Sequence, residues 1–227
     1  TFTVTRNRSS DVAQTVQYGT VAGSAIAGAD YTGTSGTLTF APGTLTQTFV
    51  VSTTDDTLFD TASPENYTAT LSAPSLGGTL AAGTATAAIT DNEATPTFSI
   101  GNASVGEGGT MTFTVTRTGN AEAAQTVQFG TANSGAGIGF AASGSDYTTN
   151  AGTLTFNTGD TTKTFTVASI QDASAEGNET FSATLGATTG NATVVVATGT
   201  GTVLDDDIPI YSISAPAALT EGGVATF

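Results

Sequence analysis

The chain lacks several residue types on which common protein chemistries depend. Its 227 residues include no cysteine, no histidine and no tryptophan. Without cysteine, neither disulfides nor thiolate chemistry contribute to the fold or to a site. Without histidine there is no imidazole to act as a general base or to bind zinc. These absences disfavour disulfide scaffolds, zinc sites and imidazole-based catalysis.

Positive charge is nearly absent as well. Only 4 Lys and Arg residues oppose 19 Asp and Glu residues, which gives a formal net charge of −15. Such a chain repels nucleic acids and anionic membranes and attracts cations. In addition, no apolar run approaches the ~18 residues that a membrane span requires. We therefore expect no nucleic-acid partner and no direct membrane insertion.

What the chain does contain is an internal repeat. Thr1–Arg6 returns as Thr112–Arg117, and Gln14–Thr20 returns as Gln125–Thr131 with Phe in place of Tyr, both at a spacing of 111 residues. A third copy begins near the end, at Leu219–Phe227. Because the period is as long as a domain, each repeat can hold its own core.

Hydrophobic residues recur at every second position, as in Phe2 and Val4 or Phe165 and Val167, with threonine between them. This alternation favours strands over helices. It predicts an all-β fold of tandem immunoglobulin-like antiparallel β-sandwiches, with about seven strands each. In the second repeat we expect strands at residues 97–105, 110–117, 125–131, 152–156, 162–168, 179–186 and 193–204.

Three segments follow from the repeat and the strand pattern. Residues 1–93 are expected to form a domain without its first strand, and residues 97–207 a complete domain. Residues 208–227 are expected to supply the first strand or strands of a following repeat.

Acidic residues concentrate in particular loops of the predicted sandwiches. Because strand direction alternates, the loops after the first, third and fifth strands and the exit of the last strand lie at one end. In the second repeat these segments carry Glu107, Asp146, Asp172, Glu176, Glu179, Asp205, Asp206 and Asp207. In the first repeat they carry Asp30, Asp55, Asp56, Asp60, Glu65, Asp91 and Glu93, and the third copy adds Glu221. Only Asp11, Glu122 and Asp160 are expected elsewhere.

Two interpretations of this acidic end are open. Charge runs usually lie in water and need no ligand. However, a random scatter would not spare the opposite end of both repeats, and crowded carboxylates raise one another's pKa unless a cation neutralises them. Ligands that are all oxygen suit Ca²⁺, which takes about six to eight of them. The sequence therefore predicts calcium binding at this end.

At these residues the chain resembles tandem Calx-β domains, the immunoglobulin-like sandwiches of sodium-calcium exchangers, integrin β4 and many bacterial surface proteins. The second repeat carries the ordered motifs Val105–Gly109, Thr112–Arg117, Gly144–Tyr147, Gly152–Phe156, Lys163–Val167, Asp172–Phe181 and Asp205–Asp207. The resemblance implies calcium ligands at Glu107, Asp146, Asp172, Glu176 and Asp205 to Asp207, with Glu179 beside them. In the first repeat it implies ligands among Asp30, Asp55, Asp56, Asp60, Asp91 and Glu93.

Two departures from the family pattern affect the expected sites. Gln171 stands where the family often has an acid, which removes one calcium position. The first repeat has Asp60–Pro64 in place of the Glu-Gly segment, and its exit reads Asp91–Glu93. We expect the site of the first repeat to be the weaker one.

The functional expectation is a calcium-binding structural or adhesive segment at the cell surface or outside the cell. Calcium is expected to stiffen the junctions with neighbouring repeats of the same protein. The alternative is a calcium-sensing regulatory module of a larger protein. Paired carboxylates also occur in glycosidases, but here the acids recur in both repeats and no tryptophan is present to stack on a sugar. We therefore expect no enzymatic activity.

Thr1–Phe2 and Thr226–Phe227 both align with Thr112–Phe113. One interpretation is that the chain is a window from a longer tandem array. The other is that residues 208–227 add a strand to the first repeat of another copy, which builds a head-to-tail filament. Both interpretations place Glu221 beside the first-repeat acids, such as Asp30, of a following copy.

Overall fold

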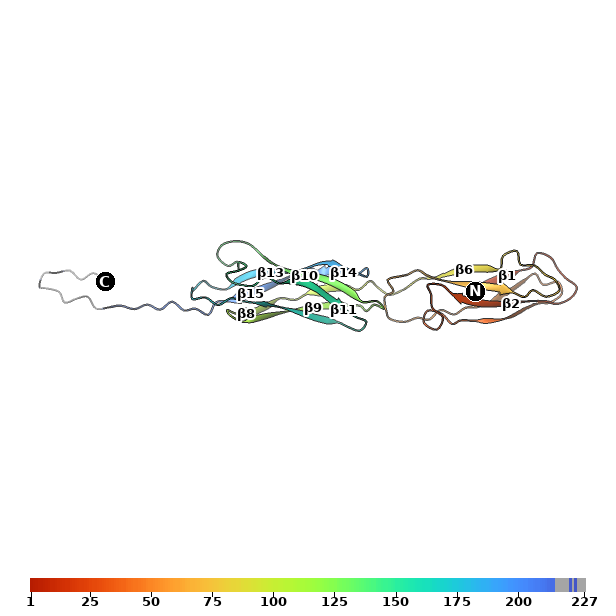
Figure 1. Cartoon of the computed structure of the whole chain (residues 1–227), viewed down its shortest axis with the longest axis horizontal. Helices are drawn as coiled ribbons and strands as arrows, with labels where there is room; N and C mark the ends of the chain where they lie inside the picture. The colour runs from red at the N-terminus through yellow and green to blue at the C-terminus, as the bar shows by residue number, and fades with distance from the viewer. Residues whose placement is uncertain (215–220, 222, 224–227) are drawn as a thin grey trace. The chain divides into compact units, whose positions relative to one another are not determined.

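The computed structural model describes residues 1–214, 221 and 223, and the described chain is built from strands (Figure 1). It contains no helix among these residues, and hence none long and apolar enough to cross a membrane. The strands form two compact units. The first unit consists of Thr1–Pro96 together with Gly119–Ala124 and Asn157–Gly159, and the second consists of the remaining described residues.

The first unit has two sheets, and all its strand pairs are antiparallel. The smaller sheet pairs β1 (Phe2–Thr5) with β4 (Thr46–Phe49). The larger sheet has the order β3-β2-β5-β6, with β3 at Ser35–Phe40, β2 at Gln14–Ala22, β5 at Glu65–Ser72 and β6 at Thr84–Ile89.

The second unit has a four-stranded and a five-stranded sheet. The first has the order β12-β9-β7-β14, with β12 at Thr162–Ala168, β9 at Thr110–Thr118, β7 at Thr97–Ile100 and β14 at Thr193–Val196. The second has the order β11-β10-β13-β15-β8, with β11 at Ala151–Phe156, β10 at Gln125–Asn133, β13 at Glu179–Thr188, β15 at Thr198–Leu204 and β8 at Ala103–Gly106.

The predicted all-β fold with tandem sandwiches is confirmed, with one refinement. The first and last predicted strands of the second unit each divide between the two sheets, and their halves pair parallel, β14 with β7 and β15 with β8. A hydrogen bond joins the two segments where they pass from one sheet to the other: Asn102 Oδ1 accepts from Thr200 N at 2.8 Å. At Gly199 a side chain would collide with the carbonyl oxygen of Gly101, so the two chain segments approach closely only because residue 199 is glycine.

Alternation of threonine and apolar residues sets which face of each strand is buried. In β9, Met111, Phe113 and Val115 are buried while the threonines at 110, 112 and 114 are exposed. The second core contains sixteen buried residues and the first contains nine. The first is smaller because that unit has no described counterparts of β7, β8 and β14.

Candidate metal centre

A buried tyrosine fixes the position of one acidic residue in each unit. Tyr31 stacks on Tyr67 with ring centroids 4.4 Å apart, and Tyr147 stacks on Phe181 at 4.1 Å. Both Tyr31 and Tyr147 are fully buried. Because the ring is locked in the core, the aspartate that precedes it is held at the end of the sandwich.

The loop before each tyrosine has the same hydrogen bonds in both units. Asp30 Oδ2 accepts from Ile26 N, and Asp146 Oδ2 accepts from Ala142 N, both at 2.5 Å. Each loop turns at a glycine in the left-handed region, with φ of 96° at Gly28 and 92° at Gly144. The repeated motif therefore folds into one repeated loop structure that presents a carboxylate.

In the second unit, six predicted ligands form two groups of three. In each group one oxygen from every carboxylate lies within 4.8 Å of the others. One group draws on the loop between β8 and β9 and on the exit of β15. The other draws on the loops between β10 and β11 and between β12 and β13. The groups are Glu107 with Asp206 and Asp207, and Asp146 with Asp172 and Glu176.

The two remaining predicted acids of this unit are tied to the same network. The Glu179 carboxyl is hydrogen-bonded to Asp146. Asp205 Oδ2 accepts from Gly177 N at 3.1 Å, in the same loop that carries Glu176. The structure thus brings all eight predicted acids of the second repeat to one end of that unit.

Burial and crowding raise the pKa values of several of these carboxyls. For Glu107, burial raises the pKa, and the charges of Asp172, Asp205 and Asp207 raise it further against a lowering hydrogen bond from the Asp172 N–H. Burial followed by neighbouring carboxylates also raises the pKa of Glu176 and Asp207. Protonation thus relieves part of the repulsion, and a cation would relieve it too.

The donor set fits a hard cation. The two groups offer only carboxylate oxygens, drawn from irregular loops, which suits Ca²⁺. In addition, Asp207 Oδ2 is shielded from solvent and accepts no hydrogen bond from any described residue. A shielded carboxylate oxygen without a donor is costly unless a positive charge lies beside it.

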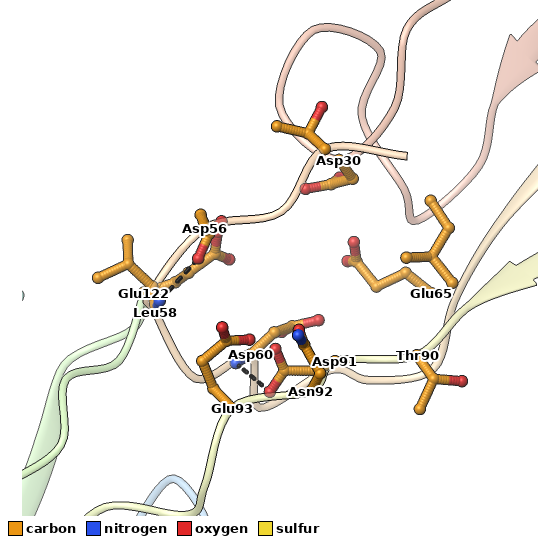
Figure 2. Close-up of a pocket in the computed structure, with 12 residues that line it drawn as sticks. Asp30, Asp56, Leu58, Asp60, Glu65, Thr90, Asp91, Asn92, Glu93 and Glu122 are labelled. Carbon is orange, nitrogen blue, oxygen red and sulfur yellow. Dashed lines mark hydrogen bonds between the residues drawn. The ribbon is translucent and has the colours of Figure 1, made fainter. Parts of the chain in front are cut away.

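In the first unit, six of the seven predicted acids and Glu122 line a pocket of about 60 Å³ (Figure 2). Asp60 N donates to Asp91 Oδ2 at 3.1 Å, and Asp60 Oδ1 accepts from Ala62 N at 2.7 Å. The first bond joins the loop before β5 to the segment after β6, and the second lies within that loop. The acids that line the pocket are Asp30, Asp56, Asp60, Glu65, Asp91, Glu93 and Glu122.

Glu65 in the first unit has the same environment as Glu179 in the second. Burial raises the pKa of Glu65 to about 7, helped by the charges of Asp30 and Asp60 and by a hydrogen bond with Asp30. For Glu179, burial, the hydrogen bond with Asp146 and its charge raise the pKa to about 7. In each unit the glutamate that opens the strand therefore has a raised pKa, in part because it lies beside the aspartate of the Asp-Tyr motif.

Asp55 does not line the pocket, but its Oδ1 accepts from Asn92 Nδ2 at 3.1 Å. Gln171 stands at the corresponding position of the second unit, and its Nε2 donates to Asp206 Oδ1 at 3.0 Å. Gln171, where the sequence departs from the family pattern, thus donates a hydrogen bond to the predicted ligand Asp206.

The prediction that Glu122 lies away from the acidic residues is wrong. Glu122 belongs to the segment Gly119–Ala124 of the first unit and lines its pocket, where its backbone N donates to Phe59 O at 3.2 Å. Glu122 aligns with Asp11 at the spacing of 111 residues, so both repeats carry an acid at this position.

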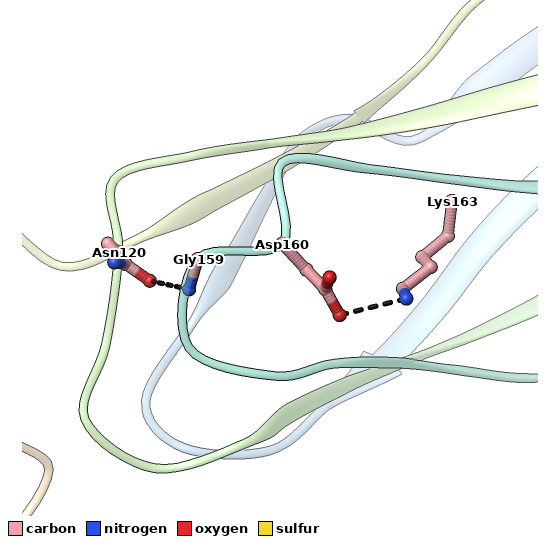
Figure 3. Close-up of polar contacts among 4 residues, drawn as sticks. All are labelled: Asn120, Gly159, Asp160 and Lys163. Atoms are coloured by element: carbon pink, nitrogen blue, oxygen red, sulfur yellow. Dashed lines mark hydrogen bonds and ion pairs between the residues drawn. The ribbon is translucent and has the colours of Figure 1, made fainter.

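Asp160 and Glu221 are two further acids. Asp160 Oδ2 forms an ion pair with Lys163 Nζ at 2.8 Å, which accounts for an acid outside the groups (Figure 3). Glu221 is exposed, and the residues around it at 215–220, 222 and 224–227 lie outside the described chain. The predicted contribution of residues 208–227 to a following repeat therefore stays a prediction.

The family model of the Calx-beta domain matches residues 1–93 and 91–207. No curated protein matches the sequence. Among solved structures, the apo form of the Calx CBD1 domain is 25% identical, with a TM-score of 0.45, and covers 50% of this chain and 100% of its own. CBD12 from CALX1.2 is 21% identical, with a TM-score of 0.41, and covers 88% of this chain and 91% of its own. Since the family model matches most of the sequence, the chain belongs to the Calx-beta domain family and carries two of these domains in tandem.

Proposed function

We propose that both units bind calcium and that the chain is a non-enzymatic structural segment of a protein outside the cell or on its surface. The observation that carries the proposal is the pair of three-carboxylate groups in the second unit, each with oxygens within 4.8 Å of one another. Asp207 Oδ2, shielded and without a donor among the described residues, adds to it.

The residues that would hold calcium follow from the geometry. In the second unit they are the two groups, with Glu179 and Asp205 beside them. In the first unit they are the acids of the pocket, chiefly Asp30, Asp56 and Asp60 with the exit residue Asp91. Bound calcium would neutralise the repulsion and would tie together loops that are far apart in the sequence.

Calcium is also proposed to stiffen the junctions between repeats. The acidic exit of the first unit ends at Glu93, four residues before β7 begins at Thr97, and Asp205 directly follows β15. An ion held by an exit segment and by loops of the same unit restricts the backbone that leads to the next repeat. Small-angle scattering of the full chain should therefore give a narrower distribution of dimensions with calcium than with chelator. Identical distributions would contradict the stiffening.

The affinity for calcium separates the structural role from its alternative, a calcium-sensing regulatory module. Extracellular modules bind calcium at ~10⁻⁴–10⁻³ M, whereas sensors bind at ~10⁻⁷–10⁻⁵ M. The low lysine content, the absence of cysteine and the family favour a surface or secreted protein with an adhesive or spacer role.

Calorimetric titration of the full chain tests both roles. We expect binding in the weaker range, with magnesium binding more weakly still. The variant Asp146→Asn should lose part of the heat, and Asp160→Asn, which alters an acid outside the groups, should not. No heat at millimolar calcium would rule out both roles.

A further inference from the structure

We propose that Ser169 is a positioning residue of the candidate calcium site. Its buried hydroxyl fixes the loop that carries Glu107, and with it the group of Glu107, Asp206 and Asp207. The inference rests on the calcium binding proposed above. It adds a residue that acts through the backbone of this loop and not as a ligand.

The loop that carries Glu107 has little of its own to hold its shape. It runs from Gly106 to Gly109, and three of its four residues are glycine. Glycine loses more backbone freedom on ordering than any other residue. At Gly108 the backbone lies in the left-handed region, with φ of 69°. Contacts from outside the loop must therefore keep the Glu107 carboxylate in place.

Ser169 makes several hydrogen bonds to this loop. Its Oγ accepts from Gly109 N at 2.9 Å, and its O–H donates to Gly106 O at 2.9 Å, with Gly109 O at 3.1 Å as a second acceptor. Its backbone N donates to Gly109 O at 2.9 Å. One side chain thus joins the first and the last residue of the loop. In addition, Glu107 N donates to Leu204 O at 3.2 Å, directly before the acids that follow β15.

The strand pattern also distinguishes Ser169. Phe165 and Val167 are buried at alternate positions of β12, and Ser169 continues this alternation just beyond the strand. Ser169 is only 7% exposed, and core packing alone favours an apolar residue at such a position. A buried hydroxyl is tolerated where it is hydrogen-bonded, and the partners of this one belong to the loop of Glu107. We infer that the serine at this position serves the loop.

The segment that begins at Ser169 follows the loop further. The Gln171 side chain lies against Gly108, where an added Cβ atom would be 3.3 Å from Gln171 Cβ. Asp172 N lies 3.4 Å from Glu107 Oε2, which is a long hydrogen bond. Gln171 and Asp172 are exposed, whereas Ser169 is buried. Ser169 is therefore the fixed point of this contact.

The first unit has a hydroxyl residue at the same place. Tyr147 forms an antiparallel bridge with Ser169, and its counterpart Tyr31 forms the same bridge with Thr53. A threonine is therefore compatible with this backbone geometry. It offers a conservative variant that keeps the hydroxyl.

Calorimetric titration of calcium into the full chain tests the inference. Asp30→Asn and Asp60→Asn are introduced first, so that the heat of this parent chain comes mainly from the second unit. Ser169→Ala should then weaken the calcium affinity at least about tenfold, because loss of a residue that orients metal ligands typically costs about 10–100-fold. Ser169→Thr should stay close to the parent affinity. Thr188→Val is the matched control, since it removes a hydroxyl that donates to Ala192 O at 2.5 Å where β13 ends, away from the carboxylate groups.

Thermal unfolding separates a positioning role from a merely structural one. Loss of a buried hydrogen bond lowers the melting temperature both with and without calcium. If Ser169 positions the loop, Ser169→Ala should lower the melting temperature more in calcium than in chelator, because weaker binding stabilises the folded state less. Thr188→Val should lower it by the same amount in both.

The outcomes keep this inference apart from the proposed function. An unchanged affinity in Ser169→Ala would overturn the positioning role and leave calcium binding intact. Equal losses in Ser169→Ala and Ser169→Thr would also overturn it, because only the alanine variant lacks the hydroxyl. No heat in the parent chain or in the chain without any substitution would refute calcium binding itself, and the positioning role with it.

Discussion

Phe113 and Val115 of the second unit are closed off from solvent, whereas their counterparts Phe2 and Val4 in the first unit are half-buried. The two segments have nearly the same sequence. The difference comes from β7, which covers one edge of β9 and has no described counterpart beside β1. Burial of a strand is therefore decided by its neighbours in the sheet, even where the strand sequence itself is repeated.

The acidic ends differ in a second way, by the exchange of an amide and a carboxylate. In the first unit Asp55 accepts from Asn92, and in the second Gln171 donates to Asp206. Each unit thus keeps one charge and one hydrogen bond between the loop and the exit segment. The exchange indicates that two carboxylates at this contact would repel each other unless an ion lay between them.

The largest expected effect separates the two cores. Phe113→Ala should cost about 3–5 kcal/mol of unfolding free energy, because it leaves a cavity in a closed core. Phe2→Ala should cost less, about 1–2 kcal/mol, because that side chain is only partly buried. Urea unfolding of the full chain, followed by hydrogen exchange in each unit, measures both. Equal losses would break the comparison between the two cores.

The next effect concerns the contact between the loop and the exit segment, where the amide and the carboxylate change places between the two units. Gln171→Asp should raise the calcium affinity of the second unit on the order of tenfold, because it adds a carboxylate beside the group of Glu107, Asp206 and Asp207. The same change should cost about 1 kcal/mol without calcium, since the hydrogen bond to Asp206 is lost. Asn92→Asp is the matching change in the first unit. Calorimetry with Gln171→Asn as the control checks this, and an unchanged affinity would show that the contact lies outside the ion site.

A smaller effect separates the two buried tyrosines. Tyr147 Oη donates to Asn133 Oδ1 at 2.8 Å, whereas Tyr31 Oη is buried without a hydrogen-bond partner among the described residues. Tyr147→Phe should therefore cost about 1 kcal/mol, while Tyr31→Phe should be neutral or stabilising. Thermal unfolding of the two variants, with hydrogen exchange to assign each unit, measures the difference. A similar loss for both would mean that Tyr31 has a partner in solution.

The last expected effect is one that both units share. Glu65 and Glu179 both have a pKa raised to about 7, so the folded state binds more protons than the unfolded state between about pH 4.5 and pH 7. Stability without calcium should therefore be greatest at low pH in this window and should fall as the pH rises through about 7. Chemical unfolding across this window measures the trend, and Glu65→Gln/Glu179→Gln should flatten it. A rise in stability with pH would contradict the raised pKa values of the two glutamates.

The strands were predictable because threonine alternates with apolar residues, a pattern that only a half-buried strand produces. The division of the first and last strands of the second unit between its two sheets could not be predicted. It depends on contacts such as that of Asn102 with Thr200, which are nearly a domain apart in sequence. Local patterns specify which residues are extended, but they leave open which sheet an edge segment joins.

The acidic end of the second unit was also predictable, since alternation of strand direction brings its loops together. The division of those acids into two groups could not be predicted, because it depends on how each loop folds. Glu179, for example, bonds to Asp146, and Gln171 holds Asp206. Glu122 was missed because its loop follows β9 in the sequence yet belongs to the first unit.

Anomalous diffraction from crystals grown with calcium would show whether the carboxylate groups bind this ion. We expect ion density between Glu107, Asp206 and Asp207, and between Asp146, Asp172 and Glu176. Weaker density is predicted in the pocket of the first unit. A map with the carboxylates ordered and no ion at either group of the second unit, at millimolar calcium, would contradict calcium binding at these groups.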